Sequence, residues 1–177
     1  MWLLNRILVI ALLTGVAVSS GCSTLKYATK KEAIKHVYIA PVTNRTPEEG
    51  ADIFFSKAAD EAFYTDSRFM VDMQPIPDET IIIKPTVKNI SSYSVGYNIY
   101  DQAIEYKINV TATIKLIKYG YKHPFKTFTI SAYEFYSAVG SPSEVEQRKK
   151  EAIEAAAKKI FRELGEKLLE EESGKSN

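Results

Sequence analysis

Residues 102–118 read QAIEYKINVTATIKLIK, and their alternation decides the fold. The even positions carry apolar side chains, which are Ile104, Tyr106, Ile108, Val110, Ala112, Ile114 and Leu116. The odd positions from 105 to 115 are charged or polar. Because successive side chains of a strand point to opposite faces, the pattern predicts one strand with an apolar and a polar face. At about 3.3 Å per residue it would span roughly 50 Å, so its end should project beyond a small core.

A strand is predicted on each side of this stretch. In residues 81–97 one parity carries the apolar side chains of Ile81, Ile83, Val87, Tyr93, Val95 and Tyr97. Pro85 cannot donate to a ladder, which places that part of the strand at an edge or a bulge. Residues 125–136 alternate in the same way, with Phe128, Ile130 and Ala132 opposite polar neighbours. Short turns join the three strands, so they should form an antiparallel meander.

Two amphipathic helices are predicted around the meander. Thr46, Pro47 and Glu49 form a capping-box pattern before a helix that ends near residue 66. Ser141-Pro142 and Glu144 repeat the pattern before a helix that runs to about residue 171. Residues 37–42 read as a strand, and residues 69–73 as a candidate short strand. The sequence therefore predicts an α+β, two-layer sandwich: a mainly antiparallel four-stranded sheet, plus that candidate short strand, with two helices on one face.

The first 21 residues are typical of a secretory signal. Arg6 precedes an apolar run over residues 7–18, and Ser19, Ser20 and Gly21 follow. The run is shorter than the about 20 residues that a membrane-spanning helix needs, which favours a cleaved signal over an uncleaved anchor.

Cys22 is the only cysteine of the chain and follows those small residues directly. The arrangement resembles a bacterial lipobox, whose cysteine receives a diacylglycerol and palmitate and becomes the new N-terminus. Ordinary signal cleavage with a free thiol is the alternative. Ser23 stands where many inner-membrane lipoproteins carry aspartate, so the outer membrane is the favoured location, with the protein lipid-anchored on its periplasmic side.

Charge and motifs argue against several functions. Removal of residues 1–21 would leave 22 basic and 22 acidic residues, whereas a nucleic-acid-binding protein needs a basic surplus. His36 and His123 have no cysteine or carboxylate at metal-ligand spacing, and no nucleophile elbow or phosphate loop is present. We expect neither an enzyme nor a cofactor, and no nucleic-acid partner.

The tyrosines gather in the predicted meander, which holds eight of the eleven. Packing between neighbouring strands explains most of them. It explains Tyr97, Ile99 and Tyr100 less well, because they lie at the turn between the two longest strands. Apolar side chains at a projecting turn predict contact with a partner or a lipid.

In this order, several short segments resemble the LPS-assembly lipoprotein family LptE. They are IKHVYIAP (34–41), NRT (44–46), ISSYS (90–94), YD (100–101), EY (105–106) and EA (151–152). Asn44, Arg45 and Thr46 can equally be read as a turn with a helix cap. The sequence patterns together with the resemblance predict a signal peptide at 1–21, a lipidated tether at 22–35, one LptE-like α+β domain at 36–172 and a disordered tail at 173–177.

The resemblance also implies a function without catalysis. The protein would plug and support the assembly of an outer-membrane β-barrel lipopolysaccharide translocon, an LptD-like partner, and would bind lipopolysaccharide on its way to the outer leaflet. The alternative is an outer-membrane lipoprotein that activates a cell-wall synthase or assembles a secretion pore. A long meander with a projecting hairpin favours the first function.

Overall fold

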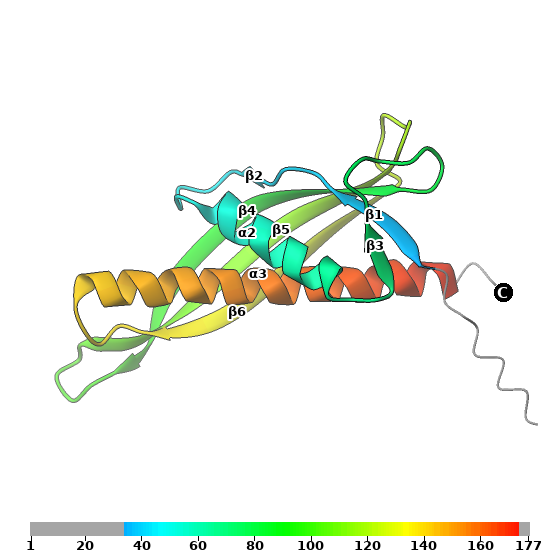
Figure 1. Cartoon of the computed structure of the whole chain (residues 1–177). Coiled ribbons are helices and arrows are strands. Elements are labelled where there is room, and N and C mark those ends of the chain that lie inside the picture. The colour runs from blue at the N-terminus through cyan, green and yellow to red at the C-terminus, as the bar shows by residue number, and fades with distance from the viewer. Residues whose placement is uncertain (1–33, 174–177) are drawn as a thin grey trace, which may run out of the picture. The chain divides into compact units, whose positions relative to one another are not determined.

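The structure is a computed structural model that describes residues 34–173 (Figure 1). Its strands are β1 (Lys35–Ile39), β2 (Thr43–Asn44), β3 (Phe69–Val71), β4 (Ile81–Tyr97), β5 (Ala103–Lys118) and β6 (Lys126–Ser137). Its helices are α2 (Ala51–Tyr64) and α3 (Pro142–Ser173). The α+β class predicted from the sequence is therefore confirmed.

The sheet has six strands and mixed pairing. Its order is β3-β1-β4-β5-β6, and β2 pairs with β4. The meander of β4, β5 and β6 is antiparallel, as expected. The expectation of a mainly antiparallel four-stranded sheet is wrong for the remainder, since β1 pairs parallel with β3 and β4, and β2 pairs parallel with β4. The helix α2 brings the chain back to the end of the sheet where β1 begins, which makes the next strand, β3, parallel to β1.

A bulge in β4 reverses its side-chain parity. The pairing with β5 shifts between Val87 and Asn89, so that Ile90 faces Val110 and Tyr93 faces Lys107. The sequence reading placed Tyr93 on the same face as Val87, and this is wrong because one extra residue turns the following side chains over. Tyr93 consequently lies 46% exposed.

Pro85 lies inside the sheet and not at its edge. The carbonyls of Ile83 and Val87 accept hydrogen bonds from Ala40 and Arg45, at the two ends of the segment that contains β2. Residues two positions apart in a strand direct their backbone groups to the same neighbour, so the Pro85 nitrogen faces the gap between the β1 and β2 pairings. The missing N–H group therefore breaks no ladder bond to β5.

Both helices cover one face of the sheet, so the predicted two layers are present (Figure 1). Phe55 of α2 meets Phe161 of α3 edge-to-face, with ring centroids 5.9 Å apart. Ile153, Ile160 and Leu164 of α3 are fully buried against the even-numbered side chains of β5.

The two helix starts differ in how they are capped. At α3, the Ser141 N–H donates to Glu144 Oε2 (2.7 Å), as the capping box predicts. The predicted cap of α2 is wrong: the N-cap is Gly50, at φ 75°, without a side-chain hydrogen bond. Thr46 instead donates from its N–H and its hydroxyl to Asn44 Oδ1, at 2.9 and 2.8 Å. Asn44, Arg45 and Thr46 thus form a turn that starts at the last residue of β2.

Candidate functional site

The turn between β4 and β5 presents the side chains singled out from the sequence. Ile99 is 89% exposed, Tyr100 76% and Tyr97 56%. The last pair between β5 and β6 is Glu105 with Ser137, so the end of the hairpin has no third strand beside it (Figure 1). The structure thus places all three apolar side chains in solvent at the projecting end. We call residues 97–101 the tip.

The tip is a turn held by several hydrogen bonds. Asn98 Oδ1 accepts hydrogen bonds from the N–H groups of Tyr100 (2.9 Å) and Gln102 (3.0 Å). The Asn98 N–H donates to the Gln102 carbonyl at 3.0 Å, and Asp101 adopts a left-handed φ of 58°. A turn that is fixed by such hydrogen bonds presents its exposed side chains at low entropic cost, which suits a contact surface.

The face of the sheet opposite the helices is polar and basic. Lys84 of β4 lies directly opposite Lys115 of β5, and neither has an ion pair within the described residues. β4 carries no acidic residue, and Glu105 is the one acid of β5. Two like charges that lie directly opposite each other destabilise a sheet, so binding of an anion between Lys84 and Lys115 would be favourable.

Aromatic side chains lie farther along the same face. The Lys107 Nζ lies 3.8 Å from the centroid of the Tyr133 ring and 5.9 Å from that of Phe135. Tyr133 and Phe135 meet edge-to-face at 5.7 Å and are each about half exposed, at 48% and 49%. This face, which we call the open face, therefore combines cations with aromatic rings.

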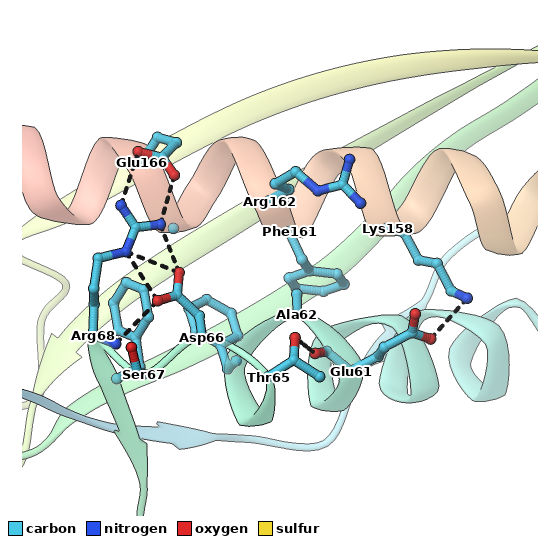
Figure 2. Close-up of a pocket in the computed structure, with 13 residues that line it drawn as sticks. Glu61, Ala62, Thr65, Asp66, Ser67, Arg68, Lys158, Phe161, Arg162 and Glu166 are labelled. Atoms are coloured by element: carbon cyan, nitrogen blue, oxygen red, sulfur yellow. Dashed lines mark hydrogen bonds and ion pairs between the residues drawn. The ribbon is translucent and has the colours of Figure 1, made fainter.

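A pocket of about 420 Å³ lies between α3 and the end of α2, with the turn that leads to β3 (Figure 2). Phe63, Phe69 and Phe161 form its buried floor. On its rim, Arg68 NH2 lies 2.6 Å from Asp66 Oδ2 and 2.7 Å from Glu166 Oε1. The Arg68 guanidinium lowers the pKa of both carboxyl groups.

Sequence reasoning missed the environment of His36. Its Nδ1 lies 2.9 Å from Asp72 Oδ1, and the Thr80 hydroxyl donates to Asp72 Oδ2 at 2.5 Å. Spacing along the chain gave no signal for this cluster, because β1 and the end of β3 meet only in the parallel sheet. The described residues hold no group of three potential metal ligands.

Cys22 lies outside the described residues, so its lipidation stays a prediction. Within residues 34–173 the structure contains no helix that is long and apolar enough to cross a membrane.

Comparison with known proteins identifies the family. The family model LptE, described as lipopolysaccharide-assembly, matches residues 34–169. The chain belongs to the LptE family. The match includes the tip, the open face and the pocket, and confirms the resemblance seen in the sequence. Membership in LptE associates the chain with lipopolysaccharide assembly and agrees with the expectation that it is not an enzyme.

Solved structures share the LptE-like fold at low sequence identity. A Xanthomonas campestris protein is 12% identical with a TM-score of 0.54, and the match covers 82% of this chain and 91% of that one. A candidate lipoprotein from Caulobacter crescentus CB15 is 11% identical with a TM-score of 0.53, and the match covers 76% of this chain and 92% of that one. A Chlamydia trachomatis protein is also 11% identical, with a TM-score of 0.53, and the match covers 77% of this chain and 96% of that one. No curated protein matches the chain.

Proposed function

We propose that this LptE-family protein is an outer-membrane lipoprotein, held on the periplasmic side by a lipid on Cys22. It supports a β-barrel lipopolysaccharide translocon of the LptD type and helps to deliver lipopolysaccharide to the outer leaflet. Binding is non-covalent throughout and needs no cofactor. The observation that carries the proposal is the tip, which exposes Ile99 and Tyr100 to solvent on a hydrogen-bonded turn.

The tip fits a contact with the barrel or with the acyl part of lipopolysaccharide. Ile99 is 89% exposed and the neighbouring Tyr100 is 76% exposed, so neither side chain contributes much to the stability of the isolated domain. Burial of such a pair in an apolar site contributes favourably, because about 25 cal/mol is gained per Å² of apolar surface removed from water.

The open face fits the phosphate groups of the same ligand. Lys84 and Lys115 face each other without a counterion among the described residues, and Lys107 lies farther along. A phosphate between the two opposed lysines would remove their mutual repulsion. This surface adds an anionic contact to the apolar contact at the tip.

The experiment replaces Ile99 and Tyr100 together by serine in the tagged full-length chain. Free energy of unfolding should change by less than about 1 kcal/mol, because both side chains are exposed. Recovery of a large β-barrel protein from solubilised outer membranes, or binding of purified lipopolysaccharide, should fall by about tenfold if the pair is a hot spot.

The matched control replaces Ile53 and Tyr121 by serine. These residues are 67% and 65% exposed and lie on α2 and on the turn before β6, away from the tip. The control should keep barrel recovery and lipopolysaccharide binding. Unchanged binding of the tip variant would contradict the role of the tip. Co-purification of a cell-wall synthase in place of a barrel would contradict the function itself.

A further inference from the structure

The pocket between α2 and α3 differs from the tip and the open face, because it is a concave site lined by residues of both helices. Its volume of about 420 Å³ is large enough for a small organic molecule. The floor is apolar and buried: the Phe63 ring meets that of Phe69 at 5.0 Å and that of Phe161 at 6.4 Å between centroids, in both cases edge-to-face. Gly165 completes the floor on the side of α3 and leaves space where a side chain would lie.

The rim of the pocket carries three cations, two of which are already paired. Arg68 binds Asp66 and Glu166 through five hydrogen bonds of 2.6–3.3 Å. The Lys158 Nζ lies 2.7 Å from Glu61 Oε2 and therefore bridges the two helices. Arg162 has no hydrogen-bond or ion-pair partner within the described residues.

Arg162 lacks a partner for a tertiary reason. Glu166 follows it by four positions on α3, a spacing that usually allows an ion pair within a helix. Both Glu166 oxygens instead bind Arg68, which reaches across from the turn before β3 (Figure 2). The five N–H donors of the Arg162 guanidinium are therefore available beside a pocket with an aromatic floor.

We propose that this pocket binds a small organic carboxylate whose apolar body lies on the phenylalanine floor and whose carboxylate pairs with Arg162. The planar guanidinium can hold a carboxylate through two parallel hydrogen bonds. The three rim cations are matched by three acids, Glu61, Asp66 and Glu166. The C-terminal end of α2 adds partial negative charge. A ligand with one negative charge is thus preferred over a phosphate dianion.

The test uses the purified full-length chain in detergent micelles and 3-phenylpropanoate as the probe. Saturation-transfer NMR, with empty micelles subtracted, measures its binding. We expect saturable binding of the acid, much weaker binding of 3-phenylpropanamide, which has the same shape without the charge, and weaker binding of phenyl phosphate. Absence of saturable binding, or equal binding of acid and amide, would overturn the proposal.

Variants locate the site. Arg162→Gln should weaken binding of the acid roughly tenfold or more, since it removes a charge-assisted pair. Arg162→Lys should restore part of the affinity. The control Lys150→Gln removes the same charge from α3 outside the pocket and should bind like the unmodified chain. Loss of binding in Lys150→Gln, or normal binding in Arg162→Gln, contradicts the assignment.

Gly165→Ala should change ligand binding and protein stability in opposite directions. The new methyl group would meet the Phe69 ring at 3.6 Å, which is ordinary contact. The melting temperature should rise because alanine favours a helix over glycine, whereas binding of 3-phenylpropanoate should weaken as the floor becomes narrower. Unchanged or tighter binding would show that the probe lies elsewhere.

Discussion

The Nδ1 atom of His36 lies 2.9 Å from the Oδ1 atom of Asp72, although 36 positions separate the two residues. The Asp72 side chain is only 7% exposed. Its second oxygen accepts the Thr80 hydroxyl hydrogen, and Thr80 Oγ1 itself accepts the Ile76 N–H at 2.8 Å. The carboxylate therefore holds β1, the end of β3 and the start of β4 together.

The Asp72 cluster predicts a loss of stability in acid. Burial alone would raise the pKa of Asp72, but hydrogen bonds from Thr80 and His36 lower it below the ordinary value of 3.8. A carboxyl group with a lowered folded-state pKa stabilises the fold above its unfolded-state pKa, and this contribution is lost as pH falls through the folded-state pKa. Urea unfolding between pH 7 and pH 2, with Asp72→Asn as the comparison, measures it.

Asp72→Asn should lower the free energy of unfolding at pH 7 by about 1–3 kcal/mol, because buried partners lose a charged acceptor. The difference between the two chains should become smaller toward low pH. If the difference in free energy of unfolding between the two chains is the same from pH 7 to pH 2, protonation of Asp72 does not contribute to the loss of stability in acid.

Glu154 should contribute more to stability than an ordinary helix acid. Its Oε1 lies 2.9 Å from Lys57 of α2 and 3.2 Å from Lys158, and these contacts lower its pKa, the Lys57 contact most. Among the residues that the structure describes, Glu163 pairs with Lys167 alone, at 3.4 Å. We expect Glu154→Gln to cost about 1 kcal/mol in urea unfolding and Glu163→Gln a few tenths, roughly 0.3. Equal costs would contradict a network between the helices.

The apolar stripe of α3 should dominate the stability of the domain. Ile160 and Leu164 are fully buried against the sheet. Ile160→Ala or Leu164→Ala should each cost about 2–5 kcal/mol, because the methyl groups removed leave cavities that the core fills only in part. Thermal or urea unfolding checks this value. Losses as small as those expected for Glu163→Gln would mean that α3 packs loosely.

Lys115→Glu should separate stability from ligand binding. An opposite charge facing Lys84 replaces repulsion by attraction, so the free energy of unfolding should rise by about 0.2–1 kcal/mol. Binding of purified lipopolysaccharide should weaken, since the open face loses a cation and gains an anion. If the variant is more stable and still binds lipopolysaccharide normally, Lys84 and Lys115 are not part of the proposed binding site.

Cys22 should carry lipid in the mature protein. Intact mass of the membrane-extracted chain should begin at Cys22 and include acyl groups. Cys22→Ser should release the protein from the membrane fraction, because the acyl chains contribute about 0.8 kcal/mol per buried methylene group. A mature chain that starts at another residue and carries a free thiol would contradict the prediction.

The sequence by itself determined the local structure. The alternation in residues 102–118, the capping box at Ser141 and the spacing of Ile153, Ile160 and Leu164 predict β5 and α3 correctly. These features depend on neighbours a few positions apart, and so a linear reading suffices. The tip was predictable for the same reason, since it follows from two long strands and one short turn.

Only the tertiary structure decided the rest. The bulge at residue 88 turned Tyr93 to the open face, and three of the five strand pairings are parallel, among them the β1–β3 pairing that the crossover through α2 creates. Asp72 contacts His36, which lies 36 positions away in the sequence. Arg68 binds Glu166, 98 positions away, and Arg162 is therefore left without this partner. Such contacts arise from the way the layers pack, and a pattern with a period of two or 3.6 residues carries no record of them.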